Sequence, residues 1–398
     1  MPFAIIVVLA LLLGAAAVAF EEGGEDEPAA PLRPASLERI VAAVERERGL
    51  EFERVPRPAV VTPDQARREG LESLDQDYPP ARRRADQEVL ELLGLVPEGT
   101  DLKKAYESTL TEAVSGYYDP RKDRLRIVSG AQTANRVLYE MVLAHELTHV
   151  LEDQTFEFDL DALAAGGDRA LALSALIEGT ATALMYRYVQ NRFGAEELFG
   201  GLAASAFGGT GDLPPFLTAQ LVFPYTAGEA FVAHLLRVGG GGWRVVDAAL
   251  RFRPPESTEQ ILHPGKYVRL EEPRRVSLRG PLRALGEGWR PLTRSTFGEW
   301  QTQKLLARAG GTGSARAAAG WGGDSYALLG RGDERVLVLR WTWDSPRDEA
   351  EFTAALKAWE REALPAGTER VAIAREGGAV TLVLARGADR ARRVARAD

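Results

Sequence analysis

The stretch HELTH occupies residues 145–149 and lies within an apolar segment at 136–155. Apolar side chains recur in this segment at helical spacing, so the sequence predicts one long buried helix. Because residues i and i+4 project from the same face of a helix, the imidazoles of His145 and His149 point to one spot. Two polar rings therefore stand where the rest of this helix is apolar.

Two imidazoles at this spacing are typical of a catalytic zinc site. Zinc binds histidine nitrogen at about 2.0–2.1 Å, and a catalytic zinc takes three protein ligands and leaves a fourth position to water. The carboxylate of Glu146 is expected beside that position, where it can take a proton from the metal-activated water and pass it to a leaving amine. The alternatives are two histidines hydrogen bonded in a core, and a structural zinc that gives Glu146 no role.

The third ligand has to come from outside the motif. Glu178 is the best candidate, because it is a single acidic residue within the apolar run ALIEGTA of a second predicted helix at 168–193. The alternative is a buried acid paired with an arginine of the same helix, but neither Arg187 nor Arg192 has the spacing for such a pair.

Three other acids lie close to the motif in sequence. Asp153, one turn beyond His149, is expected to orient that imidazole as a hydrogen-bond acceptor. Asp159 and Asp161 fall in a predicted loop and are fallback ligands for the metal.

The composition excludes several classes of protein. The chain has 398 residues, 45% hydrophobic and 27% charged, which suits one large or two medium folded domains. It has no cysteine, so disulfide scaffolds, zinc fingers and iron–sulfur clusters are excluded and any metal must be held by His, Asp or Glu. A net charge of −8 and a pI near 5.4 argue against a nucleic-acid binder, so no nucleic-acid partner is expected.

The amino terminus has the features of an export signal. Residues 4–20 are apolar without interruption, which is close to the shortest stretch that spans a bilayer, and 17–19 read AVA, a pattern that signal peptidase cuts. We therefore expect residues 1–20 to be a signal peptide or a single membrane anchor and 21–35 to be an acidic, flexible linker. The protein is then exported, and is either secreted or anchored to the outer face of the cytoplasmic membrane.

The rest of the chain is predicted to fold in two parts. Residues 36–280 form a metallopeptidase-like domain, in which strands 114–118 and 124–128 make a hairpin before the zinc helix. Residues 281–398 form a smaller α+β domain, since all seven tryptophans lie at or after Trp243. The expected fold class is α+β, with a mainly helical core, a small β-hairpin and a small α+β C-terminal domain.

Further predicted elements are helices at 37–48, 63–72, 84–93, 297–308 and 346–362, and strands at 59–62, 325–329, 334–343, 369–374 and 379–386.

HELTH followed by ALIEGTAT resembles the gluzincin zinc metallopeptidases, whose thermolysin-type members use two histidines and one glutamate. The chain is also similar to an uncharacterised family of exported bacterial predicted peptidases in the segments GYYDP (116–120), HVLEDQ (149–154), FPY (223–225), PESTEQILHP (255–264) and GWGGD (320–324). The resemblance implies that His145, His149 and Glu178 bind Zn²⁺ and that Glu146 is the base. It implies no role for the later segments. Thermolysin-type enzymes have an aspartate one turn after the glutamate ligand, where this chain has Thr182.

Peptide hydrolysis also needs a hydrogen-bond donor for the oxyanion and a strand edge that holds the substrate. The hairpin strand before the zinc helix is expected to supply the edge. Tyr225, at a Pro-flanked helix start, and His263, in a Pro-rich loop, are two hypotheses for the donor. The alternatives are a phenol that caps a helix and a loop histidine hydrogen bonded to backbone carbonyls.

The predicted function is hydrolysis of peptide bonds in a peptide or protein substrate by an exported, zinc-dependent metallopeptidase. The alternative is a noncatalytic cell-envelope protein with a structural zinc site and a partner-binding C-terminal domain, and a third hypothesis is a zinc amidase that acts on cell-wall peptides.

Overall fold

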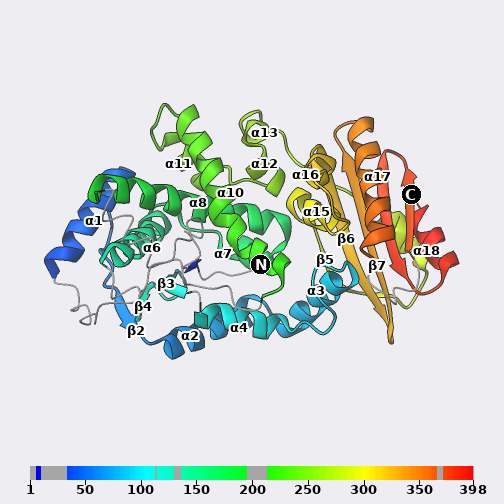
Figure 1. The fold of residues 1–398 in the computed structure, drawn as a ribbon, viewed down its shortest axis with the longest axis horizontal. Helices are drawn as coiled ribbons and strands as arrows, with labels where there is room; N and C mark the ends of the chain where they lie inside the picture. Colours follow the sequence, from blue (N-terminus) through cyan, green and yellow to red (C-terminus); the bar gives the residue numbers. More distant parts are fainter. Residues whose placement is uncertain are drawn as a thin grey trace.

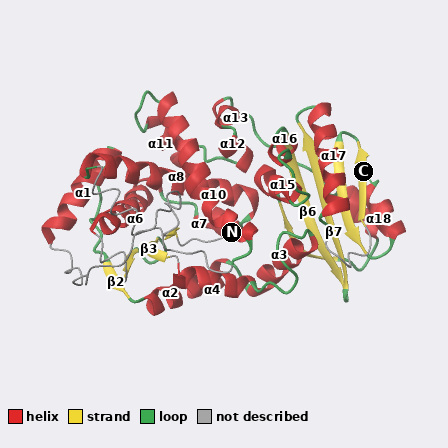
Figure 2. Cartoon of the chain, viewed as in Figure 1, coloured by secondary structure: helices red, strands yellow, loops and turns green. Residues whose placement is uncertain are grey.

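The computed structural model describes residues 6–9, 34–112, 114–129, 136–194, 213–364 and 371–397. Helices surround a small sheet in one part of the molecule, and a five-stranded sheet forms the other part (Figure 1, Figure 2). The predicted α+β fold class is confirmed. The predicted leader and linker at 1–35 lie outside the described residues except for 6–9 and the first turn of the first helix.

The first part of the chain is mainly helical. Its helices are α1 (Pro34–Arg48), α2 (Pro63–Asp77), α3 (Pro80–Leu92), α4 (Leu102–Glu112), α6 (Arg136–Phe156), α7 (Leu160–Ala165), α8 (Gly167–Arg192), α10 (Pro215–Val238), α11 (Arg244–Arg251), α12 (Thr258–Leu262) and α13 (Pro264–Val268). Helices α6 and α8 begin and end within one residue of their predicted bounds, because their long apolar runs bury nearly every turn.

The small sheet contains β1 (Ile6–Leu9), β2 (Ala59–Val61), β3 (Val114–Asp119) and β4 (Arg124–Val128), in the order β1-β3-β4-β2. Strands β3 and β4 form the predicted hairpin. Strand β1 pairs antiparallel with the other side of β3. The expected free edge is therefore absent from the described backbone, since β2 pairs with the outer side of β4, the strand before the zinc helix, and β1 pairs with the outer side of β3.

Two glycines let helices α8 and α10 touch along their backbones. A Cβ on Gly228 of α10 would lie 2.0 Å from the carbonyl oxygen of Ala175, and one on Gly179 of α8 would lie 2.3 Å from the oxygen of Gly228. Any larger side chain would push the helices apart, because real Cβ atoms do not come this close to a backbone oxygen. The contact places α10 beside Glu178, the residue before Gly179.

The C-terminal part is a sheet between two helical layers. Its strands are β5 (Arg290–Ser295), β6 (Trp321–Arg331), β7 (Glu334–Trp343), β8 (Val371–Glu376) and β9 (Ala379–Ala385), all antiparallel in the order β5-β6-β7-β9-β8. Its helices are α14 (Arg279–Leu285), α15 (Gly298–Ala307), α16 (Ser314–Ala318), α17 (Pro346–Glu362) and α18 (Ala388–Ala395). Side chains alternate along the strands, so Leu328 packs in the cluster with α17 and Leu329 in the cluster with α14 and α18.

The apolar core runs without a break across the predicted boundary at 280/281. Trp300 on α15 packs against Phe216 and Phe223 of α10, with ring centroids 5.7 and 5.1 Å apart. These residues belong to one cluster that extends from α1 to α17. The two parts therefore share a core although their secondary structure differs.

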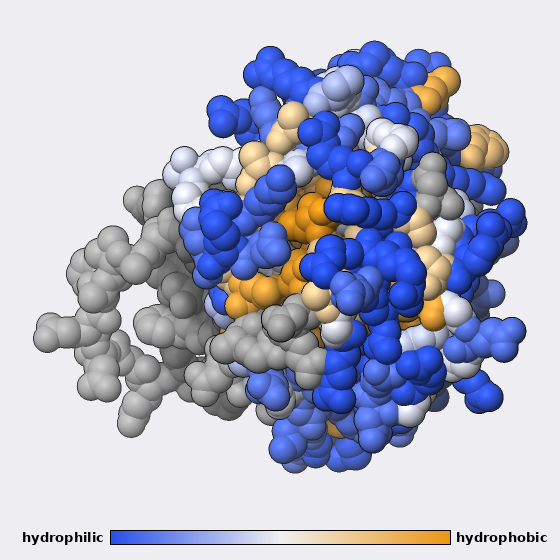
Figure 3. All heavy atoms as spheres, turned by 90° about the vertical axis from the view of Figure 1, so that its right-hand side faces the viewer, coloured by the Kyte–Doolittle hydropathy of each residue, from blue (hydrophilic) through white to orange (hydrophobic). Residues whose placement is uncertain are grey.

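The outer face of the C-terminal part is largely hydrophilic, and hydrophobic side chains are visible only in a hollow near its centre and at scattered points (Figure 3). Within the described ranges, no helix has both the length and the apolar character that a membrane span requires.

Substituting Gly228 with Ala tests the α8–α10 contact. We expect Gly228→Ala to lower the free energy of unfolding by about 1–3 kcal/mol, because the new methyl group overpacks a backbone contact. Chemical denaturation measures this loss. The control is Gly313→Ala, where a Cβ meets nothing within 4 Å and φ is −95°, so its stability should match the wild type. Equal stability of the two variants would contradict the close packing.

Candidate metal centre

Three predicted ligands converge between α6 and α8. Nε2 of His145 lies 3.1 Å and Nε2 of His149 lies 3.4 Å from the same carboxylate oxygen, Oε2 of Glu178. All three side chains are buried, and their ligand atoms lie within 4.8 Å of one another. The two rings come from one helix and the carboxylate from its neighbour, as the sequence predicts.

The spacing of these atoms fits a small tetrahedral ion. Ligands about 2.0–2.1 Å from a tetrahedral zinc lie about 3.3 Å from one another. The two distances to Oε2 of Glu178 lie on either side of this value. Nε2 of His149 is buried and has no hydrogen bond to any described residue, and this is unfavourable for a polar atom unless another group, such as a metal, contacts it. The donor set of two nitrogens and one carboxylate oxygen also suits zinc.

Burial sets the protonation of the ligands. It lowers the pKa of the His145 imidazole to about 4 and that of His149 to about 3. Both rings are therefore neutral at pH 7, which is the form that binds a metal. Burial raises the pKa of the Glu178 carboxyl, while hydrogen bonds from His145 and Tyr225 oppose that shift.

Glu146 lies on the face of α6 that contacts strand β3. Its side chain is fully buried, and a Cβ on Gly116 of β3 would lie 3.3 Å from its Cγ and 2.8 Å from Cγ1 of Val142. Only a glycine fits between the strand and the helix at this point. We did not predict a role for Gly116, although it lies in GYYDP, one of the segments that resemble the exported peptidase family.

Tyr225 belongs to the site. Its hydroxyl donates a hydrogen bond to Glu178, and its ring centroid is 6.2 Å from that of His145. The predicted helix start at Tyr225 is wrong, because Pro224 and Tyr225 lie in the middle of α10. Pro224 cannot donate to the carbonyl of Gln220, yet packing against α8 keeps the helix continuous.

The structure does not bring His263 to the metal centre. Its Nε2 lies 2.8 Å from Oε1 of Glu299 on α15, and its other electrostatic partners are Glu259 and Lys266. The hypothesis that His263 donates to the oxyanion therefore has no geometric support. The reason is that α12 packs against both α8 and α15, and Lys266 of α13 pairs with Asp344 of the C-terminal part, so His263 faces α15.

Asp153 does not orient His149, contrary to the prediction. Its carboxylate accepts hydrogen bonds from the hydroxyl of Tyr118, at 2.9 Å, and from the backbone N–H of Phe158, at 3.1 Å. Nδ1 of both metal-site histidines is buried with no hydrogen-bond partner among the described residues, as is the hydroxyl of Thr182. The fallback ligand Asp159 instead caps α7.

The segments PESTEQILHP (255–264) and GWGGD (320–324) lie where the two parts of the chain meet, since the backbone N–H of Trp300 on α15 donates to the hydroxyl of Thr258 over 3.1 Å. The carboxylate of Asp168, on α8, accepts hydrogen bonds from the backbone and the hydroxyl of Thr258. The carboxylate of Asp324, in GWGGD, accepts from the backbone N–H groups of Phe297 and Gly298 at the start of α15. A structural role at this junction explains why these segments supply no group to the metal centre.

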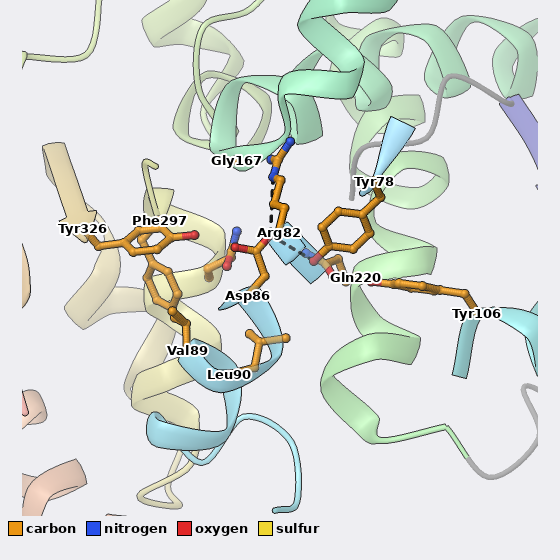
Figure 4. A pocket seen from close by; sticks show the side chains of 11 residues that line it. Tyr78, Arg82, Asp86, Val89, Leu90, Tyr106, Gly167, Gln220, Phe297 and Tyr326 are labelled. Carbon is orange, nitrogen blue, oxygen red and sulfur yellow. Dashed lines mark hydrogen bonds and ion pairs between the residues drawn. The ribbon is translucent and has the colours of Figure 1, made fainter. Parts of the chain in front are cut away.

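A cavity of about 50 Å³ lies at the same junction (Figure 4). Tyr78, Asp86, Gln220 and Tyr326 line it, and Oδ2 of Asp86 accepts a hydrogen bond from the hydroxyl of Tyr78. Ligand pockets usually measure about 300–1,000 Å³, so this cavity has room for a few water molecules only. None of the predicted site residues lines it.

The C-terminal part of the chain matches a known family model. Residues 289–397 match a domain of unknown function (DUF8575). No curated protein and no solved structure matches the chain. The matched region contains β5–β9 and lies within the predicted C-terminal domain at 281–398.

The ion pair of His263 predicts a pH dependence of stability. The hydrogen bond to Glu299 raises the pKa of His263 in the folded state, so its stabilising effect is complete below the unfolded pKa of about 6.5 and is lost as pH rises through the folded value. We expect His263→Gln to flatten the decrease in stability above about pH 6.5. Urea denaturation at a series of pH values measures this. The control is His234→Gln on α10, outside the cluster, and an unchanged slope in His263→Gln would contradict the assignment.

Proposed function

We propose that this protein is an exported, zinc-dependent metallopeptidase that hydrolyses peptide bonds. The observation that carries the proposal is the convergence of His145, His149 and Glu178 from two helices, with Glu146 in the same helical turn. A core histidine pair would not need a buried carboxylate between the rings, and a structural zinc site would leave Glu146 without a task.

The side chains around the centre have separate roles in hydrolysis. Zinc bound by the three ligands would act as a Lewis acid that polarises the peptide carbonyl and lowers the pKa of water. Glu146 accepts the proton of the attacking water and returns it to the departing amine. Because the site is buried on α6 under strand β3, the carboxylate works away from bulk water, where charge interactions are stronger.

Tyr225 is the proposed donor to the oxyanion. Its phenol reaches Glu178 from α10, which places a hydroxyl beside the carboxylate ligand rather than at the surface. A rigid donor of this kind stabilises negative charge that develops on the substrate oxygen. The close contact of α8 and α10 at Gly228, one turn after Tyr225, fixes its distance from Glu178.

Export is part of the proposal, and it rests on the apolar stretch at 4–20 and the acidic segment that follows. The site would then act on peptides or proteins outside the cytoplasm, from a secreted enzyme or one held at the membrane.

Glu146→Gln tests the proposed base. We expect kcat/KM for peptide hydrolysis to fall by about 10²–10⁴-fold while bound zinc stays at the wild-type level, because the amide keeps the shape of Glu146 but cannot accept a proton. Hydrolysis of unstructured protein substrates and metal analysis of the purified protein measure the two effects. The control is Glu157→Gln, an exposed residue just after α6. A wild-type protein that binds zinc without any hydrolysis would favour the noncatalytic alternative.

Tyr225→Phe tests the proposed donor. Loss of one oxyanion donor typically lowers kcat by about 10²–10³-fold, and we expect a decrease of this size with little change in zinc content. Steady-state kinetics and zinc titration measure both quantities. If zinc affinity falls and kcat of the zinc-loaded variant does not, the phenol serves only to hold Glu178.

A further inference from the structure

A second contact joins α6 and α8 beside the metal centre. The hydroxyl of Thr180 on α8 donates to Oε2 of Glu152 on α6 over 2.6 Å, and both residues are fully buried. Glu152 follows His149 by less than one helical turn, and Thr180 lies two residues after Glu178. The contact therefore connects the two ligand-bearing helices close to their ligands.

Arg48 neutralises this buried carboxylate from α1. Its Nε donates to the other oxygen, Oε1 of Glu152, over 2.6 Å, and its Nη2 lies 2.6 Å from Asp247 of α11. The guanidinium lies 4.5 Å from the ring centroid of Trp243. Arg48 is itself 1% exposed, so removing it would leave an uncompensated charge in the core.

The metal centre requires an accurate register between α6 and α8. A helix advances about 1.5 Å per residue, whereas metal–ligand distances tolerate about 0.2 Å. Apolar packing has little directional preference and permits small slides, but a short hydrogen bond to a carboxylate fixed by Arg48 does not. A directional contact this close to His149 and Glu178 can therefore set their separation.

We propose that Glu152 and Thr180, held by Arg48, are positioning residues that keep the ligands of α6 and α8 at metal-binding distance. The inference rests on the proposed function, because it assumes that this centre binds zinc. Substitution of groups that orient metal ligands typically lowers metal affinity by about 10–100-fold, so loss of the Thr180 hydroxyl should weaken zinc binding by about 10-fold.

The chain offers a matched control for this contact. The hydroxyl of Tyr188 on α8 donates to Oε2 of Glu140 on α6, also over 2.6 Å and also buried. This contact lies at the far end of the helix pair, where Arg39 and Arg136 also bind Glu140. Tyr188→Phe therefore removes a similar cross-helix hydrogen bond without touching the register at the ligands.

The experiment compares zinc affinity with stability in the full chain. The zinc Kd is measured by competition with a chromogenic chelator, and the thermal unfolding of the metal-free protein shows that each variant is folded. We expect Thr180→Val to raise the Kd by about 10-fold, Thr180→Ser to restore it because the hydroxyl returns, and Tyr188→Phe to keep the wild-type Kd.

Each outcome has a distinct meaning. If wild type binds zinc and Thr180→Val binds it equally well, or if Tyr188→Phe weakens binding as much, the contact is only structural and the inference is overturned while the proposed function stands. If the wild-type protein binds no zinc, the proposed function fails and the inference fails with it.

Discussion

Burying a carboxylate in a helical core is unfavourable unless other groups compensate its charge, and three buried carboxylates on α6 and α8 show how this requirement is met. Glu178 lies between two imidazoles and the phenol of Tyr225. Glu152, on the neighbouring helix, is compensated by Arg48 and a hydroxyl of α8. Asp168, at the first turn of α8, binds the backbone and hydroxyl of Thr258. Together these contacts join α8 to α6, α10 and α12, so the polar groups determine how these helices are arranged around it.

The parts of this arrangement that depend on local pattern were predictable from the sequence. The periodicity of the apolar residues places α6 and α8, and the spacing within HELTH places two imidazoles on one face. Glu178 was identifiable as a candidate ligand because an isolated acid within an apolar helix needs a partner, and the structure brings it to the two histidines.

The parts that depend on packing between distant elements were not predictable in this way. Tyr225 follows a proline, which in sequence resembles a helix start, yet α10 continues through it because glycine contacts bind it to α8. His263, in a Pro-rich loop, was a hypothesis for the oxyanion donor, and no sequence pattern shows that α12 and α13 turn it toward Glu299. Asp153 has the right spacing for His149, but its carboxylate accepts a hydrogen bond from Tyr118 of the hairpin instead.

The match to DUF8575 begins at residue 289, yet the core does not divide there. Trp300 fills a space between aromatic rings of α10, and Asp168 of α8 lies so close to Gly298 that a Cβ there would meet its Oδ1 at 1.8 Å. Such contacts couple the melting of one part to the melting of the other. The homology boundary therefore does not mark a thermodynamic domain, and heating this chain should give a single calorimetric peak whose enthalpy belongs to both sheets together.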